Sequence, residues 1–319
     1  MKIIVCYCFL AAVIWSLDAV TFQGQNYAAF LEYEQKFNLK FKDDSEREYR
    51  FGVFSNNLKE ISQLNVKYPE ATFGITSFTH LTKEEFSKRV MTERPILLRN
   101  SEEFLPQNFS TKAPTYFDWR SQNVVTSNKD QEDCGSCYAF GSAAVVESYT
   151  AIKTGVLYDL SEQQIVDCDI YSKGCTYGYL NSALNVAKTT GLVKASSYPY
   201  QDRQGSCQSL NGPKFKISNY IYLTDENAIA NALYNNGPIL FSMVCPSALQ
   251  YYTGGVFSMD EGICMADKIG YHSPVIVGYS SDYWIVKNSW GTYWGENGYL
   301  RLKRGINACD MTSEAIALQ

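Results

Sequence analysis

A cysteine at the start of a helix-forming run constrains this chain of 319 residues more than any other feature. Cys137 follows the segment 131–136 and precedes the apolar run 138–154, which predicts a helix. The positive end of a helix dipole favours thiolate over thiol, and the thiolate is the nucleophile. The position of Cys137 therefore predicts a reactive thiol, whose partners must come from elsewhere in the chain.

Two downstream residues are the candidate partners. His272 follows Cys137 by 135 residues (272 − 137), and Asn288 follows it by 151 (288 − 137). A histidine base and a group that orients it are what a cysteine nucleophile needs for hydrolysis. The chain has two histidines, and the other is His80, far upstream of Cys137. These residues together predict a cysteine hydrolase.

Each of these residues also has a simpler interpretation. Cys137 lies in a C-x-x-C pattern with Cys134, which suits a redox pair, and structural disulfides are common in secreted proteins. His272 alone suits a structural histidine, and Asn288 a turn. A redox motif needs neither Gln131 nor the downstream residues, so the hydrolase interpretation is favoured.

The N-terminus predicts a secretory signal peptide. Met1 and Lys2 precede a short apolar stretch, 3–15, which is shorter than the ~20 residues of a membrane span. We expect residues 1–20 to be removed, with a buried N-terminal helix as the alternative. No other stretch is long and apolar enough to span a membrane. The net charge of −5, without a basic stripe, argues against nucleic acid as a partner.

Eight of the ten cysteines follow the predicted signal: Cys134, Cys137, Cys168, Cys175, Cys207, Cys245, Cys264 and Cys309. With a signal peptide, this number predicts an oxidising compartment and disulfide bonds. Their spacing alone does not determine the pairing.

The composition changes near Lys112. Residues 22–112 contain no cysteine and carry balanced charge, whereas acidic residues outnumber basic ones from Ala113 onward. After Ala113, helical patterns come first and short strand-like runs follow, which predicts an α+β fold. The predicted helices are 137–154, ended by Gly155, and a second capped by Ser161; the predicted strands include 256–257, 275–279, 283–287 and 299–303.

Two segments resemble the papain family. Residues 131–140 are similar to its active-site motif, and 287–295 to its K-N-S-W-G-x-x-W-G motif. Tyr138 stands where the family usually has tryptophan, and Glu132 where it has glycine. The resemblance covers nearly everything after the first ~20 residues. It implies a helical lobe and a β-barrel-like lobe with a cleft between them, in residues 113–319, and a cysteine endopeptidase without metal or organic cofactor.

The earlier part resembles cathepsin-L-like propeptides. Residues at helical steps match the E-R-F-N-I-N pattern: Glu46, Arg50, Phe54, Asn57, Ile61 and Asn65. Residues 74–80 resemble the G-x-N-x-F-x-D motif with two departures, Thr76 for asparagine and His80 for aspartate, and 81–86 match L-T-x-E-E-F. The resemblance implies that residues 21–112 are an inhibitory propeptide that occupies the cleft of a zymogen.

The resemblance also implies the roles of individual residues. Cys137 is the nucleophile, His272 the general base and acid, Asn288 its orienting partner, and Gln131 an oxyanion donor. Trp290 shields the histidine–asparagine hydrogen bond. The implied disulfides are Cys134–Cys175, Cys168–Cys207 and Cys264–Cys309, which leaves Cys137 and Cys245 unpaired.

Substrate-binding positions follow from the same resemblance: Gly178, Tyr177, Leu180, Ser242, Ser273, Glu314 and Trp290. Gly178 matches the glycine that pairs with the substrate backbone, and Tyr177 replaces a glycine before it. Glu314 falls at the floor of the pocket for the second residue before the scissile bond, with a surface glutamate in a C-terminal turn as the alternative. The implied partners are protein and peptide substrates, the propeptide and cystatin-type inhibitors, for a monomer in the secretory pathway, extracellular or lysosomal/vacuolar.

Overall fold

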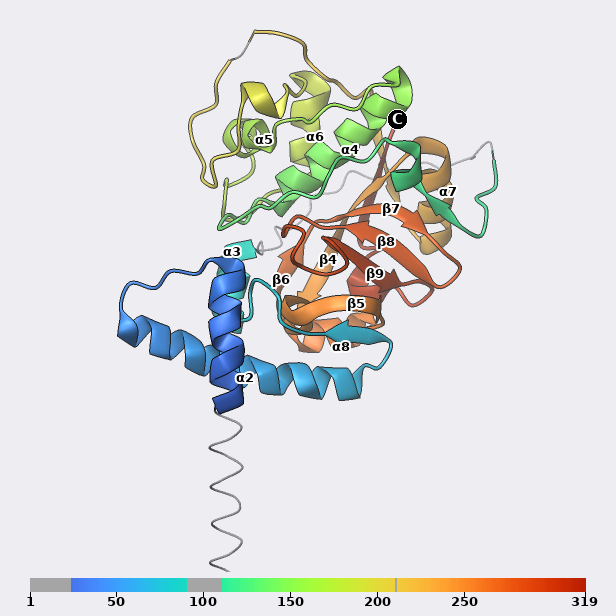
Figure 1. Ribbon diagram of the computed structural model, residues 1–319. Helices are drawn as coiled ribbons and strands as arrows, with labels where there is room; N and C mark the ends of the chain where they lie inside the picture. The colour runs from blue at the N-terminus through green and yellow to red at the C-terminus, as the bar shows by residue number, and fades with distance from the viewer. Residues whose placement is uncertain (1–23, 91–110, 210) are drawn as a thin grey trace, which may run out of the picture.

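The computed structural model describes residues 24–90, 111–209 and 211–319, and the molecule has two lobes with an N-terminal helical part against them (Figure 1). The predicted signal peptide, residues 1–20, and the segment 91–110 lie outside the described residues. In the part that the structure describes, no helix is both long and apolar enough to cross a membrane.

Three helices form the first lobe: α4 (Cys137–Thr154), α5 (Glu162–Cys168) and α6 (Leu180–Thr189). The predicted ends of α4 and the start of α5 are confirmed. Gly155 ends α4 with a φ of 75°, a conformation that glycine adopts without a steric penalty. The hydroxyl of Ser161 accepts from the backbone N–H of Gln164 and so caps α5. Most of α4 is buried, so this helix is the core of the lobe.

Strands dominate the second lobe, and the predicted α+β class is correct. The strands are β2 (Phe117–Asp118), β3 (Tyr220–Leu223), β4 (Ile239–Pro246), β5 (Tyr252–Phe257), β6 (Lys268–His272), β7 (Val275–Tyr279), β8 (Tyr283–Lys287), β9 (Tyr299–Lys303) and β10 (Glu314–Leu318). Two helices of this lobe were not predicted, α7 (Glu226–Asn236) and α8 (Glu261–Ala266). Short 3-10 turns occupy Trp119–Gln122, Ala195–Ser197, Ser247–Tyr251 and Ala308–Asp310.

The propeptide contributes a strand to the sheet of the second lobe. The sheet runs β1-β5-β9-β8-β7-β4-β10-β3, with β2 paired to β7 and β6 to β4, and β1 (Ala71–Phe73) belongs to the propeptide. It pairs antiparallel with β5, where Ala71 faces Gly255. A Cβ at Gly255 would lie 2.5 Å from the backbone oxygen of Glu70, so only glycine allows this approach. The propeptide is thus joined to the enzyme by backbone hydrogen bonds.

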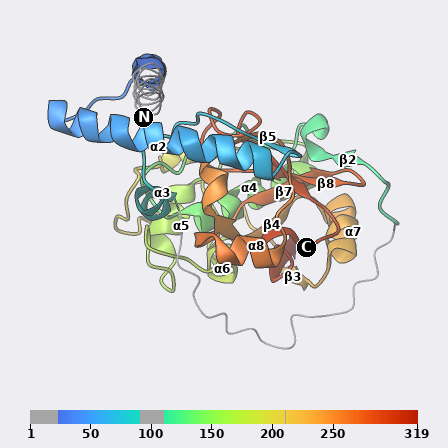
Figure 2. The ribbon, with the colours of Figure 1, turned by 90° about the horizontal axis from the view of Figure 1, so that it is seen from below.

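The rest of the propeptide is helical. Residues 24–37 form one helix, followed by α2 (Asp44–Lys67) and α3 (Lys83–Val90). Both views show α2 on the outside of the β lobe and α3 beside the junction of the lobes (Figures 1 and 2). Thr76, which replaces the asparagine of the family motif, is fully buried, and its hydroxyl donates to the backbone oxygen of Gln250 at 2.7 Å.

A glycine allows the two lobes to touch near Cys137. Gly141 lies one helical turn after Cys137, on the same face of α4. A Cβ at Gly141 would lie 2.6 Å from the backbone oxygen of Ser273 and 2.6 Å from Leu240 Cδ1. Ser273 directly follows His272. This close approach therefore packs α4, which begins at Cys137, against the end of β6, which carries His272.

Candidate active site

The orientation of His272 is determined by Asn288. His272 ends β6 and Asn288 follows β8, and the distance from His272 Nε2 to Asn288 Oδ1 is 2.5 Å. The backbone N–H of Ser289 donates to the same oxygen, so Oδ1 must be an acceptor and Nε2 the donor. Nδ1 of His272 has no hydrogen-bond partner among the described residues. It is therefore the nitrogen left for proton exchange with a thiol.

Aromatic rings cover this hydrogen bond. Trp290 is buried, and the centroid of its indole lies 4.6 Å from that of the His272 ring. Two propeptide rings also lie against Trp290, Phe86 at 5.2 Å and Phe78 at 6.0 Å. The zymogen thus excludes water from the His272–Asn288 pair.

Burial also affects the charge of His272. Loss of hydration lowers the pKa of His272 to about 4, although its hydrogen bond to Asn288 acts in the opposite direction. A histidine with this pKa is neutral at near-neutral pH. The imidazolium that would stabilise a thiolate is therefore disfavoured while the propeptide is in place.

Four groups of Gln131 make hydrogen bonds: its backbone N–H, its backbone oxygen, its side-chain oxygen and its side-chain nitrogen. Its backbone N–H donates to Ser289 O at 2.8 Å, and its backbone oxygen accepts from the Tyr200 hydroxyl at 2.7 Å. Its side-chain oxygen accepts from Ser289 Oγ at 2.7 Å, which points the amide nitrogen the other way. That nitrogen donates to Cys134 O at 2.8 Å and to Val90 O of the propeptide at 3.0 Å. The Val90 carbonyl of the propeptide thus accepts from the amide N–H that the resemblance assigns to the oxyanion.

The described part of the chain contains three disulfides: Cys134–Cys175, Cys168–Cys207 and Cys264–Cys309. These are the pairs that the resemblance implies. Because Cys134 is bonded to Cys175, it does not form a redox pair with Cys137 in this structure. Cys245 is buried in β4 and takes no part in a disulfide; burial raises the pKa of its thiol well above the ordinary value.

Tyr138 supports the segment expected to bind the substrate backbone. Its hydroxyl donates to Gly174 O at 3.0 Å. A Cβ at Gly178 would lie 2.3 Å from the Tyr138 ring, so Gly178 lies directly on the ring and no other residue fits there. Tyr177 is half-buried, and its ring centroid lies 5.9 Å from that of Tyr179 in an edge-to-face arrangement.

The four positions expected around the specificity pocket are buried in the zymogen. Glu314 and Ser242 are direct partners across β10 and β4. Leu180 begins α6, and Ser273 lies between β6 and β7. Glu314 opens a buried strand, which rules out the alternative of a surface glutamate in a turn.

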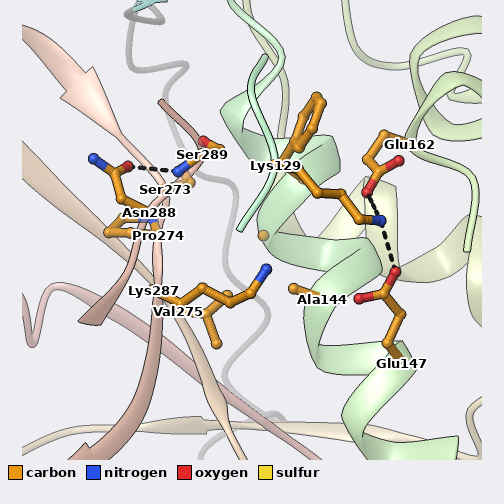
Figure 3. Close-up of a pocket in the computed structure, with 12 residues that line it drawn as sticks. Lys129, Ala144, Glu147, Glu162, Ser273, Pro274, Val275, Lys287, Asn288 and Ser289 are labelled. Carbon is orange, nitrogen blue, oxygen red and sulfur yellow. Dashed lines mark hydrogen bonds and ion pairs between the residues drawn. The ribbon is translucent and has the colours of Figure 1, made fainter. Parts of the chain in front are cut away.

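Buried charges join the lobes beneath the site. A cavity large enough for about one water molecule lies between α4 and strands β7 and β8, next to Asn288 and Ser289 (Figure 3). Lys287 extends into it from the β lobe, opposite Glu147 and Glu162. Burial lowers the pKa of Lys287, and the nearby Glu147 raises it in part.

One group of carboxylates among the described residues has the spacing of a metal site. The ligand oxygens of Glu147, Asp159 and Glu162 lie within 4.8 Å of one another. The ammonium of Lys129 lies among them, 2.8 Å from Glu147 and 2.5 Å from each of the other two. Lys129 therefore supplies the positive charge that these carboxylates need.

Sequence reasoning missed the residues that hold Gln131. Ser289 was read only as part of the K-N-S-W motif, yet it contacts Gln131 through both backbone and side chain. Tyr200 belongs to none of the motifs described above; its hydroxyl contacts Gln131 O and also lies 2.8 Å from Ser136 Oγ. The one sequence signal that Ser289 lies at the site was its position next to Asn288 in the motif. Nothing in the sequence indicated that Tyr200 contacts Gln131.

Comparison with known proteins identifies the family. Residues 113–319 match the model of the papain family cysteine protease, and residues 30–86 match the cathepsin propeptide inhibitor domain. Fruit bromelain from Ananas comosus is 35% identical over 324 residues, covering 97% of this chain and 90% of the relative. Papaya proteinase 4 from Carica papaya is 35% identical over 312 residues, covering 93% and 87%.

Solved proenzymes share the fold. Digestive procathepsin L 3 of the Tenebrio molitor larval midgut superposes with a TM-score of 0.79 at 29% identity, covering 93% of this chain and 98% of the other. A recombinant stem bromelain precursor superposes with a TM-score of 0.79 at 29% identity, covering 92% and 99%.

The fold and the site define a cysteine protease zymogen with an intramolecular inhibitor. The chain belongs to the papain family. It is a peptide-bond hydrolase, and its own propeptide blocks the protease domain, as in the proenzyme structures.

The contact between Ser289 and Gln131 yields a prediction. Ser289→Ala removes the hydroxyl that orients the Gln131 amide, a hydrogen bond worth about 1 kcal/mol. We expect kcat of the processed enzyme to fall about fivefold with KM nearly unchanged, because the amide acts on the transition state. Steady-state kinetics with a fluorogenic peptide measure both. Ser121→Ala, an exposed serine in the turn after β2, is the control, and an unchanged kcat in Ser289→Ala would contradict the assignment.

Proposed function

We propose that the protein is a cysteine endopeptidase in which Cys137 attacks and His272 transfers protons. The observation that supports this most is the commitment of His272 Nε2 to Asn288, which leaves Nδ1 for Cys137. Cys137 stands at the N-terminus of α4, where the helix dipole favours a thiolate. Gln131 bonds to Ser289, which follows Asn288, and to Cys134, three residues before Cys137, so the proposed oxyanion donor contacts the segments that carry the other proposed groups.

The reaction proceeds in two halves. The Cys137 thiolate attacks the carbonyl carbon, and the oxyanion accepts hydrogen bonds from Gln131 Nε2 and the backbone N–H of Cys137. The imidazolium of His272 gives its proton to the leaving amine as the C–N bond breaks. His272 then takes a proton from water, which attacks the thioester, and the acid product leaves as the thiolate reforms.

Endopeptidase activity is favoured over carboxydipeptidase activity. A cathepsin-B-like carboxydipeptidase needs an additional loop with histidines to close the cleft. The chain after Ala113 contains one histidine, His272, which the catalytic pair already uses. An open cleft accepts a continuous polypeptide on both sides of the scissile bond.

The remaining expectations concern partners and location. We propose a monomeric mature enzyme that cleaves proteins and peptides and is inhibited by cystatin-type proteins in the same cleft. The apolar leader supports entry into the secretory pathway, with an extracellular, lysosomal or vacuolar destination. The disulfides are consistent with an oxidising compartment.

Active-site labelling tests the nucleophile. Irreversible epoxide or vinyl-sulfone inhibitors alkylate an activated thiolate, so the processed enzyme should incorporate one inhibitor molecule, on Cys137, with loss of all activity. Buried Cys245 is the internal control and should stay unlabelled. Mass spectrometry of the labelled peptides decides. An unlabelled Cys137 would favour an inactive binding homologue, and turnover of dithiols would favour an oxidoreductase.

His80 gives the propeptide a pH-dependent contact. It is 9% exposed, and its Nδ1 lies 2.7 Å from the hydroxyl of Tyr33. The charged groups around it are Arg50, Arg89 and Glu85, and Glu85 already pairs with Arg50 at 2.7 Å. Burial first, and then the two arginines, lower the pKa of His80 to about 4.

The sign of the pH effect follows from linkage. In the unfolded propeptide the pKa of His80 returns to about 6.5, so protonation favours unfolding of the propeptide. The folded propeptide has its full stability above about pH 6.5 and loses it as pH falls towards 4, by on the order of 3 kcal/mol. His80→Asn should flatten this dependence. Thermal unfolding of the inactive Cys137→Ser zymogen across pH 4–7 measures it, with Lys59→Asn on the exposed face of α2 as the control. Identical pH profiles with and without His80 would contradict the idea.

Glu314 supports a prediction about specificity. We propose that Glu314 and Leu180 line the pocket for the second residue before the scissile bond, so that arginine and leucine are both accepted there. Glu314→Ala should lower kcat/KM for arginine peptides about tenfold and leave leucine peptides unchanged, because a charge-assisted hydrogen bond contributes about 1.5–3 kcal/mol. A fluorogenic series varied at this position measures the ratio. Glu261→Ala, on exposed α8, is the control. Equal cleavage of arginine peptides by mutant and wild type would exclude Glu314 as the specificity residue.

A further inference from the structure

Four carboxylates surround the loop that carries Gln131. We name them the acidic rim: Asp130, Glu132, Asp133 and Asp202. They are held together by the backbone, because Asp130 accepts from the N–H of Glu132 at 2.9 Å and Asp202 accepts from the N–H of Asp133. Glu132 stands where the family usually has glycine, so part of the rim is particular to this chain.

The carboxylates of the rim repel one another, although each is at least partly exposed to solvent. Burial, and then repulsion from the other carboxylates, raise the pKa of Glu132 and of Asp202. Burial also raises the pKa of Asp130. Oδ1 of Asp202 has no hydrogen-bond partner among the described residues. The cation that opposes these effects on all three groups is Arg89 of the propeptide.

Arg89 is the observed occupant of the rim. Its Nε lies 2.6 Å from Asp133 Oδ1, in an ion pair, and its guanidinium lies 5.7 Å from the centre of the Phe78 ring. The next residue is Val90, whose carbonyl accepts from Gln131 Nε2. In the zymogen, therefore, the Arg89 guanidinium lies in the acidic rim. The carbonyl of the next residue, Val90, accepts from Gln131, the proposed oxyanion donor.

The path of α3 indicates on which side of the scissile bond the rim lies. Before Arg89, Ser87 Oγ donates to Ile269 O in β6 at 2.6 Å, and Phe86 packs on Trp290. Trp290 in turn covers His272, which protonates the leaving amine. Arg89 therefore reaches the rim from the leaving-group side of the site.

We propose that the acidic rim of the mature enzyme is a subsite for arginine or lysine within the first two substrate residues after the scissile bond. Removal of the propeptide leaves four carboxylates without Arg89, and a basic substrate side chain replaces it. Arginine binds best, because its planar guanidinium matches carboxylates and stacks on aromatic rings. This subsite rests on the roles proposed above for Gln131 and His272.

The test uses the processed enzyme and internally quenched peptides. The peptides differ only in carrying arginine, lysine, glutamine or methionine at the first or second position after the scissile bond. For the wild type, kcat/KM should be roughly threefold to tenfold higher for arginine peptides than for glutamine peptides, since several partly exposed ion pairs of 0.2–1 kcal/mol contribute. High salt should shrink this preference.

Variants separate the rim from the catalytic machinery. The preference should disappear in the Asp133→Asn, Asp202→Asn double variant, whereas glutamine peptides are cleaved as before. Glu132→Gln changes an exposed position and should reduce the arginine preference by less. It takes the place of the double variant in the test if that variant does not fold. Glu261→Gln, remote on α8, is the control and should keep the full preference.

The outcomes are distinct. Equal rates for arginine and glutamine peptides in wild type, or a preference that survives in both rim variants, would overturn the subsite. Failure of wild type to cleave any peptide in the series would instead contradict the catalytic roles on which the subsite rests.

Discussion

The contact between α4 and the turn that joins β6 to β7 is the constraint on which the site depends. Gly141 leaves no side chain between α4 and the backbone of Ser273, so the two lobes approach to the distance at which any Cβ would collide. Because Cys137 lies one turn earlier on the same helix face, and His272 one residue before Ser273, this approach brings together the segments that carry these two residues. Rigid packing on both sides is what gives two distant side chains a common geometry.

The propeptide contacts the residues proposed above for catalysis and their neighbours. The propeptide adds β1 to the enzyme's sheet, covers Trp290 with two phenylalanine rings, and places the Val90 carbonyl at Gln131. Burial of His272 lowers its pKa, so the charged imidazolium is disfavoured in the zymogen. The backbone pairing of β1 attaches the propeptide without requiring a particular side chain. The phenylalanine rings and His80, in contrast, contribute only while they are buried.

Buried charge is the other organising element. Lys129 binds three carboxylates from separate segments, which holds α4 and α5 together. Burial alone would lower the pKa of Lys129, but Glu147 and Glu162 more than compensate, and the ammonium stays charged. Removing one member of such a group leaves an uncompensated charge and costs far more than the net contribution of the intact group.

Local sequence alone determined much of this protein. The helix behind Cys137 and its end at Gly155, the cap at Ser161, the later strands and the propeptide helix follow from periodicity and turn chemistry that act over a few residues. Papain-family resemblance supplied the candidate catalytic residues and the disulfide pairs. Only the tertiary structure decided which groups meet across the chain: Ser289 and Tyr200 on Gln131, Arg89 in the acidic rim, and β1 on β5. Those contacts depend on packing between segments up to about half the chain apart, which no local pattern encodes.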